Sequence, residues 1–193
     1  WIPGVASGDV VPAFALSEPD AGSDAGALTL EARPDGDDGW TLHGTKTWIS
    51  NAPDADVYSV FARTTPGTQA RGVTAFAVPG DAPGLSGERL DMVAPHALGT
   101  LRFDGVRVTT DDLLGEVDQG FGVAMRTLDN SRPLTAIFAV GIARAALEHA
   151  LAYARERRQF GRPIADFQAI QFLLADMASD VEAARLLTWK AAW

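Results

Sequence analysis

The chain has 193 residues, which is enough for one large or two small domains with a hydrophobic core of their own. Hydrophobic residues make up 47% and charged residues 21%, a composition that excludes long disorder, collagen-like repeats and a disulfide scaffold. Sixteen Lys and Arg stand against 25 Asp and Glu, and the formal charge of −9 opposes a general attraction to nucleic acid or anionic lipid. An anionic ligand therefore requires a local basic site. The chain has no cysteine, so a thiolate metal cluster is excluded and a cytoplasmic location is expected.

No signal peptide is expected at the start of the chain. Trp1 stands in place of an initiator Met, and no charged stretch followed by an apolar one comes after it. The most apolar stretch, residues 134–147, contains Thr135 and Arg144 and is shorter than the ~20 residues of a membrane span, so we expect no transmembrane helix. Residues 186–193 contain no Gly or Pro that would stop a helix, and we expect both ends to be artificial.

Residues 27–108 have the pattern of short strands joined by turns. Apolar and polar residues alternate over 28–32, a turn-forming cluster follows at 34–39, and the alternation restarts at 40–42, which predicts a hairpin. Further runs rich in β-forming residues are 46–49, 57–62, 73–78 and 101–108. Because no helical pattern separates these runs, we expect an antiparallel β-barrel or sandwich.

After Gly120 the apolar residues recur at helical spacing, and Gly and Pro become rare. The pattern predicts one helix over about 120–157, kinked or divided in two at Pro133, and another that begins near Phe167 with Asp166 as its N-cap. The apolar faces of these helices cannot cover one another completely, so helices from elsewhere or from another subunit are needed. The sequence thus predicts an α+β fold.

Two segments of the β region carry groups suited to a ligand. Backbone N–H groups around Gly22 and Ser23 could bind phosphate oxygens, or Asp and Ser side chains could simply close a turn there. At the end of a later strand, Trp48 could flank a planar ring to which Ser50 donates a hydrogen bond. Trp48 could equally belong to the core.

Four arginines, Arg155, Arg157, Arg158 and Arg162, lie within eight residues of this acidic chain. Guanidinium groups suit phosphate or pyrophosphate, although cations at a helix C-terminus also offset the helix dipole. Residues 129–133 combine Asp, Ser and Arg beside the predicted helix irregularity, where they could serve a ligand or cap the helix locally. The three histidines are too far apart to predict a zinc site, and no nucleophile elbow, Walker loop or Rossmann glycine motif occurs.

Six motifs, taken together and in order, resemble the acyl-CoA dehydrogenase family over nearly the whole chain. They are Leu16-Ser17-Glu18-Pro19-x-Ala21-Gly22-Ser23-Asp24, Gly44-x-Lys46-x-Trp48-Ile49-Ser50-Asn51, Phe103-Asp104-Gly105-Val106-Arg107-Val108, Arg132-Pro133, Arg155-Glu156-Arg157-x-Gln159-Phe160-Gly161 and Phe167-Gln168-Ala169-Ile170-Gln171. The resemblance implies an enzyme that uses FAD to oxidise an acyl-CoA thioester to the 2-enoyl-CoA and passes electrons to an electron-transfer flavoprotein or a similar acceptor. It also implies a middle β-barrel domain, 1–112, followed by the first half of an up-down four-helix bundle, 113–193, in a homodimer or homotetramer.

The resemblance also implies the site residues. Cofactor positions in the β region are Phe14, Leu16, Ser17, Gly22, Ser23, Trp48, Ile49 and Ser50. Ser17 would donate to the pyrimidine side of the flavin, Trp48 would flank its ring, and Ser50 would hydrogen-bond near N5. Positions that would contact FAD across a dimer interface are Arg157, Gln159, Phe160 and Gln168, and positions near the CoA substrate are Ser23, Asp129 and Arg132.

No catalytic base is assigned within the chain. Family members place this glutamate well downstream of the Arg-Pro motif or one residue before its arginine, where Ser131 stands here. Glu18 belongs to the turn motif and is given a structural role. Residues 92–99 replace a segment that is usually small and rich in hydroxyls, while Asp20 and Phe167 stand where glycine and histidine are frequent. Chain-length preference is therefore left open.

Two alternatives remain open. A relative that returns electrons to oxygen, such as an acyl-CoA oxidase or a nitroalkane oxidase, would share these motifs and would produce peroxide. A non-catalytic β-domain joined to a helical oligomerisation module would bind no flavin. No metal, nucleic acid or membrane is expected as a ligand or partner in any of these cases.

Overall fold

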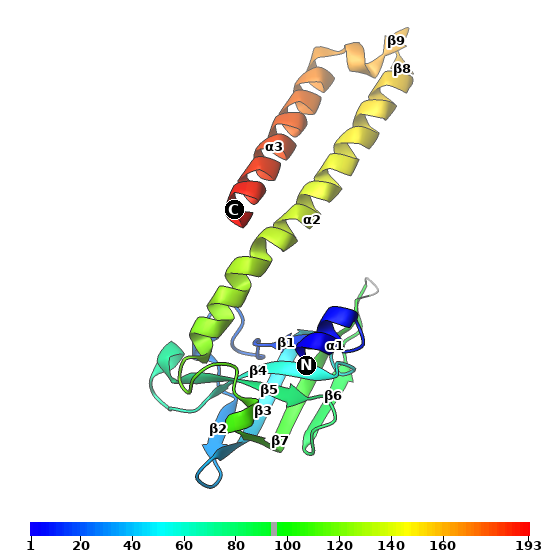
Figure 1. The fold of residues 1–193 in the computed structure, drawn as a ribbon. Coiled ribbons are helices and arrows are strands. Elements are labelled where there is room, and N and C mark those ends of the chain that lie inside the picture. The colour runs from blue at the N-terminus through cyan, green and yellow to red at the C-terminus, as the bar shows by residue number, and fades with distance from the viewer. Residues whose placement is uncertain (94–95) are drawn as a thin grey trace. The chain divides into compact units, whose positions relative to one another are not determined.

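The computed structural model describes residues 1–93 and 96–193, and these form two compact units, residues 1–126 and 127–193. We call them the β unit and the helical unit. The β unit contains a seven-stranded sheet, and the helical unit contains a pair of long helices (Figure 1). The α+β class predicted from the sequence is therefore confirmed. The predicted domain boundary after residue 112 stays a prediction.

The β unit contains the expected short strands in order, with the runs 40–42 and 46–49 joined in one strand and with further strands added. Its helices and strands are α1 (Ile2–Ser7), β1 (Pro12–Ala15), β2 (Glu31–Pro34), β3 (Gly39–Ser50), β4 (Val57–Arg63), β5 (Val73–Pro79), β6 (Leu85–Arg89) and β7 (Leu98–Thr109), with short 3₁₀ turns at η1 (Ala25–Ala27), η2 (Gln69–Gly72) and η3 (Thr110–Asp112). The predicted hairpin is confirmed, because β2 and β3 pair antiparallel with Pro34 opposite Trp40. Strand β6 was not expected from the sequence.

The sheet is mixed and open, so the prediction of an antiparallel barrel needs correction. The strand order is β1-β4-β2-β3-β7-β6, with β5 paired to β4. Strand β1 runs parallel to β4, with Pro12 opposite Val57, and β2 meets β4 in a parallel bridge between Glu31 and Arg63. Between β1 and β4 the chain forms the β2–β3 hairpin. Strand β4 then lies beside β1 and runs in the same direction. The result is a curled half-barrel.

Alternate residues of the strands build the core of the β unit. Leu42 and Ile49 of β3, Val60 of β4, Phe76 of β5 and Val106 of β7 are all less than 2% exposed. The ring of Phe76 also packs against that of Trp40, with centroids 5.5 Å apart. The β unit therefore has a core of its own, which holds its strands, and the segments attached to them, in a fixed register.

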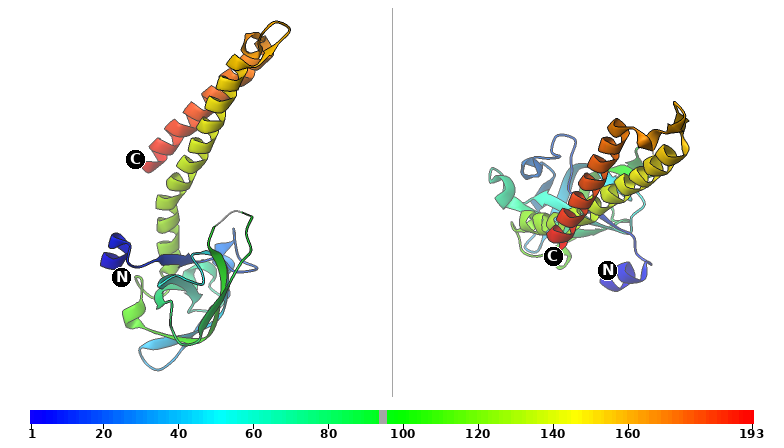
Figure 2. Two further views of the ribbon diagram at one scale, coloured as in Figure 1. Left: turned by 90° about the vertical axis from the view of Figure 1, so that its right-hand side faces the viewer. Right: turned by 90° about the horizontal axis from the view of Figure 1, so that it is seen from above.

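In the helical unit, α2 and α3 run side by side in opposite directions (Figures 1 and 2). Helix α2 (Gly120–Glu156) begins in the β unit, and α3 (Gln168–Ala192) follows a hairpin of β8 (Arg158–Gln159) and β9 (Arg162–Pro163) and the turn η4 (Ile164–Asp166). Helix α2 is continuous through Pro133, so the predicted division into two helices is wrong, while the predicted kink stays a prediction. Nearby hydroxyls bond to main-chain oxygens: Ser131 Oγ donates to Leu128 O at 3.2 Å and Thr135 Oγ1 to Ser131 O at 3.4 Å.

The start of α3 also differs from the prediction. Phe167 occupies the N-cap position without a side-chain hydrogen bond, and Asp166 is the last residue of η4 instead of the cap. The 3₁₀ turn feeds directly into the helix, since the amides of Ile170 and Gln171 both donate to Phe167 O. The N-cap position therefore falls at Phe167, one residue after Asp166.

Both long helices leave large apolar side chains exposed. Those between 51% and 75% exposed are Leu134, Phe138, Ile142 and Tyr153 on α2 and Phe172, Leu173, Leu186, Leu187 and Trp189 on α3. By length and composition α2 could cross a membrane, a property that the shorter stretch 134–147 did not suggest, but core helices of soluble proteins pass the same test. As the sequence predicted, these two helices do not cover one another completely.

Candidate functional site

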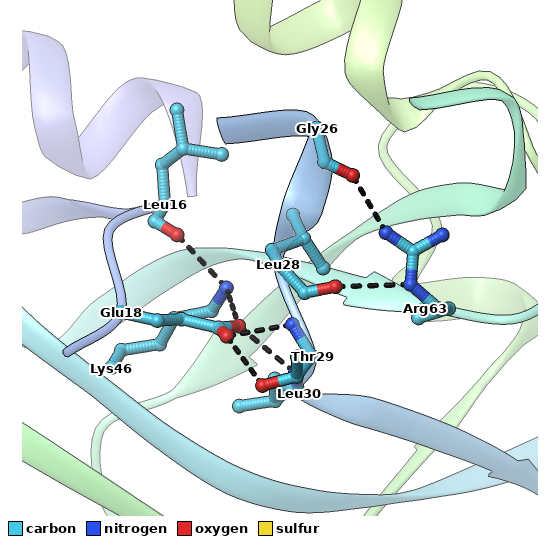
Figure 3. Close-up of polar contacts among 8 residues, drawn as sticks. All are labelled: Leu16, Glu18, Gly26, Leu28, Thr29, Leu30, Lys46 and Arg63. Carbon is cyan, nitrogen blue, oxygen red and sulfur yellow. Dashed lines mark hydrogen bonds and ion pairs between the residues drawn. The ribbon is translucent and has the colours of Figure 1, made fainter. Parts of the chain in front are cut away.

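The segment that leaves β1 lies directly against β3. The Thr47 amide donates to Ser17 O at 3.0 Å, and Lys46 Nζ donates to Leu16 O at 2.9 Å (Figure 3). Trp48 is the next residue of β3. Two segments that the sequence analysis assigned to one cofactor are therefore held side by side by hydrogen bonds.

Trp48 occupies an irregular position on β3. Lys46 pairs with Leu101 and Ile49 with Gly99, so β3 carries one extra residue there, which makes a β-bulge. Trp48 has a φ of 60°, a conformation that costs energy for a bulky residue and occurs where surrounding structure enforces it. Its side chain is 61% exposed, so the interpretation of Trp48 as a core residue is wrong.

The neighbours of these residues limit how they can meet a ligand. Ile49 is 1% exposed and belongs to the β core, so its side chain does not reach a ligand on the surface. The Leu16 side chain is also buried. Phe14 is half-buried, and its ring packs against Phe61 with centroids 4.9 Å apart. Ser17 is half-buried, and its main-chain oxygen bonds to β3.

Ser50 ends β3 and meets a third segment. Its Oγ lies 3.1 Å from His96 Nε2, and the amide of Asn51 donates to Ala97 O at 2.9 Å. A hydroxyl has one proton, so Ser50 can donate to a ligand only when His96 Nε2 donates to Ser50. The sequence does not predict this contact, because nothing in the spacing joins residues 50 and 96, and His96 stood out only as a possible metal ligand. Residues 94 and 95, within the unusual segment 92–99, lie outside the described residues.

The turn after Ser17 is closed by the main chain. Glu18 N donates to Ala21 O at 3.0 Å and Ala21 N to Glu18 O at 3.2 Å. Gly22 and Ser23 are exposed, Asp24 makes no side-chain cap, and within the described parts of the chain the Ser23 hydroxyl has no hydrogen-bond partner. The alternative of a turn closed by Asp and Ser side chains is therefore not what the structure shows.

Beneath this turn, Lys46 and Glu18 form a buried ion pair with Nζ and Oε1 2.8 Å apart. Burial alone raises the pKa of Glu18, but the charge of Lys46 and the hydrogen bonds from Lys46, Thr29 and Leu30 outweigh it and hold that pKa below its ordinary value. Burial lowers the pKa of Lys46 to about 8, because the loss of hydration exceeds the attraction of Glu18. The structural role expected for Glu18 agrees with this geometry.

The two substrate positions of the helical unit are neighbours on α2. Arg132 Nη1 bonds to Asp129 Oδ1 in an exposed ion pair. Both residues line a cavity of about 370 Å³, together with Leu187 and Thr188 of α3. Ser23, the third predicted substrate residue, belongs to the β unit.

The remaining predicted cofactor residues cluster where α2 turns toward α3. The β8–β9 hairpin has the two-residue loop Phe160–Gly161, and both residues have positive φ, 51° and 81°, as in a type I′ turn. This turn leaves Phe160 93% exposed. Arg157, Gln159 and Gln168 are exposed around it. The helical unit thus presents a guanidinium, two amides and an aromatic ring outward at one end.

Comparison with known proteins agrees with this arrangement. "Acyl-CoA dehydrogenase, middle domain" matches residues 13–106, and "Acyl-CoA dehydrogenase, C-terminal domain" matches residues 118–193. The chain belongs to the acyl-CoA dehydrogenase family. The short-chain specific acyl-CoA dehydrogenase of Bos taurus mitochondria is 50% identical over 195 residues, covering 100% of this chain and 47% of that protein.

Two solved structures resemble the whole chain. Butyryl-CoA dehydrogenase from Megasphaera elsdenii is 40% identical with a TM-score of 0.93, covering 100% of this chain and 51% of that one. A structure described as "PigA with FAD and proline" is 29% identical with a TM-score of 0.95, covering 100% and 51% respectively. The chain therefore spans about half the length of its acyl-CoA dehydrogenase relatives, and the family predicted from its motifs is confirmed.

Proposed function

We propose that the complete protein binds FAD and oxidises an acyl-CoA thioester to the 2-enoyl-CoA. The proposal rests chiefly on Trp48, a large aromatic side chain held exposed on a strained bulge next to the Ser17 segment. Family membership supports the reaction class, and the PigA structure contains FAD.

The residues of the β unit fit a flavin in their chemistry. An isoalloxazine ring is planar, with apolar faces and with hydrogen-bond acceptors at its edge. An exposed indole suits the faces, and hydroxyl groups near that indole suit the edge. Ser17 and Ser50 supply those hydroxyls, and the exposed Ser23 supplies a further donor for phosphate. FAD, when bound, accepts the hydride that leaves the β-carbon of the substrate.

The residues of this chain would bind FAD and the substrate and orient them. Hydroxyl donors at Ser17 and Ser50 stabilise negative charge on the ring edge, and Trp48 covers a ring face and excludes water. At the end of the helical unit, Arg157 offers a guanidinium suited to pyrophosphate, and we assign it with Gln159, Phe160 and Gln168 to the cofactor of an adjoining copy. Asp129 and Arg132 are assigned to the CoA arm.

The reaction also needs a carboxylate that removes the α-proton. Ser131, at one of the two family positions, uses its hydroxyl to bond Leu128 O within α2. We assign no carboxylate of residues 1–193 to this step and propose that the complete protein supplies it elsewhere. We further propose that the protein forms a homo-oligomer, passes electrons to an electron-transfer flavoprotein and is cytoplasmic.

The test is cofactor content followed by anaerobic reduction. The purified complete protein should be yellow, should contain about one FAD per chain, and should lose its flavin absorbance when butyryl-CoA is added without oxygen. A colourless protein that takes up no added FAD would contradict the proposal. Stoichiometric peroxide under air, with no transfer to an electron-transfer flavoprotein, would instead identify the oxidase relative.

A further inference from the structure

The Glu18–Lys46 ion pair is buried to a degree unusual for charged groups. The Lys46 side chain is 0% exposed and that of Glu18 3%, and the ammonium lies beneath the segment that carries Ser17 (Figure 3). Ion pairs such as Arg33–Glu31 and Arg89–Asp54, by contrast, join side chains that are more than 50% exposed. The proposed function gives neither residue a task.

Glu18 is saturated with hydrogen bonds. Its Oε1 accepts from Lys46 Nζ at 2.8 Å and from the Leu30 amide at 2.9 Å. Its Oε2 accepts from the amide and the hydroxyl of Thr29 at 2.6 and 2.8 Å. Lys46 Nζ also donates to Leu16 O. The pair therefore joins three stretches of main chain: the segment after β1, the segment before β2, and β3.

Stability alone does not account for this pair. Removing two charges from water costs several kcal/mol, and replacing a buried pair by apolar groups is often neutral or stabilising. What the pair does fix is register. With Leu16 O bound to Lys46 and Ser17 O bound to the amide of Thr47, the segment cannot slide along β3. That register sets Ser17 against the residue that precedes the Trp48 bulge.

We propose that Glu18 and Lys46 are positioning residues that hold Ser17 and Trp48 at the separation needed to bind one flavin ring. The inference rests on the proposed function, because it assumes that FAD occupies this face of the β unit. Neither side chain touches the cofactor in this account. They act through Leu16, Ser17 and the β3 main chain.

Arg63, the last residue of β4, provides a matched control because its side chain binds the same loop. Its guanidinium donates to Leu28 O at 3.0 Å and to Gly26 O at 2.8 Å (Figure 3). It also donates to Gln69 O at 2.6 Å. It thus ties down the far part of the segment between β1 and β2 without touching the residues next to Ser17. Loss of Arg63 should destabilise the β unit without moving Ser17 relative to Trp48.

The experiment compares K46M, E18Q/K46M and R63M in the complete protein. FAD affinity is measured by titrating the apoprotein, and stability by thermal unfolding without FAD. K46M leaves a buried carboxylate unpaired and should lower both. E18Q/K46M removes that charge and should recover much of the stability, but its FAD affinity should stay ~10-fold or more below wild type, because Leu16 O still lacks its charged donor.

The control separates positioning from folding. R63M should lower thermal stability while leaving FAD affinity within about twofold of wild type. FAD affinity that recovers together with stability in E18Q/K46M, or that falls equally in R63M, would overturn the positioning role. If K46M does not fold, E18Q/K46M and R63M alone decide. A wild-type protein that binds no FAD would be a failure of the proposed function and would be recognised as such before any variant is compared.

Discussion

The β unit and the helical unit differ in how they treat their apolar side chains. The β unit buries Phe76, Leu42 and their neighbours completely, whereas α2 and α3 expose residues such as Phe138 and Leu187. The site residues follow the same division. In the β unit, Ser17 and Trp48 are fixed by a core and by a buried ion pair, while in the helical unit Arg157 and its neighbours project from a hairpin turn. One unit is complete as a scaffold, and the other requires a partner surface.

The largest effect that tests this contrast is the loss of an aromatic ring in each unit. Phe76→Ala should lower the free energy of unfolding by about 3–5 kcal/mol, because it opens a cavity in a closed core. Phe138→Ala should change it by less than about 0.5 kcal/mol in the 193-residue chain, where the ring is 75% exposed. Urea denaturation followed by circular dichroism measures both.

The same two variants in the complete protein sharpen the contrast. There the cost of Phe138→Ala should rise, because added helices or a second copy cover the ring. Equal losses for both variants in the 193-residue chain would mean that the helical unit buries its own core.

The next effect concerns the outward-facing arginine of the helical unit. Arg157→Ala in the complete protein should weaken FAD binding by about 1.5–3 kcal/mol, the range for a charged hydrogen bond. Equilibrium dialysis or flavin fluorescence titration gives the value, with Arg144→Ala, an exposed α2 residue paired to Glu148, as the control. Unchanged FAD content in the Arg157 variant would refute the assignment of this turn to the cofactor.

A smaller effect is a pH dependence that belongs to the β unit alone. Because burial lowers the pKa of Lys46 from 10.5 to about 8, the unfolded chain holds this proton in a pH range where the folded chain has released it. The titration of Lys46 should therefore increase the free energy of unfolding as pH rises from 8 toward 10, by at most about 1.4 kcal/mol per pH unit. Denaturation at pH 8, 8.7 and 9.4 tests this, and Lys46→Met should abolish the gain. The raised pKa of Tyr58 acts in the opposite direction at higher pH, so the range stops below 10.

The smallest effect tests the third segment of the β-unit site. His96→Ala removes the group that holds Ser50 Oγ and should cost about 0.5–1.5 kcal/mol of FAD binding, whereas His96→Gln keeps an N–H donor and should cost less. Isothermal titration of the apoprotein with FAD distinguishes them. Identical affinities for all three proteins would show that Ser50 does not depend on His96.

The sequence predicts the local features of the fold well and the long-range ones poorly. The hairpin at 34–39 follows from its own turn residues, and the helices from their spacing. The parallel pairing of β1 with β4 joins residues about 45 positions apart and leaves no local pattern. Strand β6, with the sequence LSGER, has too few apolar residues to be recognised. The proline at position 133 suggested a divided helix, but α2 continues through it.

The candidate site shows the same limit. Its residues were found through motifs, but the contacts that organise them were not. Glu18 and Lys46 stand in two different motifs, 28 positions apart, and nothing in either motif indicates that they pair. The exposed position of Trp48 depends on a bulge and a positive φ, which a tryptophan in a strand-like run does not suggest.

The central claim is that Ser17 and Trp48 share one flavin, and the emission of bound FAD tests it most directly. In the complete protein an indole against the ring quenches flavin fluorescence, so Trp48→Leu with FAD still bound should emit more strongly and show shifted visible absorption bands. Bound FAD with the same emission and the same absorption spectrum in Trp48→Leu as in wild type would contradict the claim.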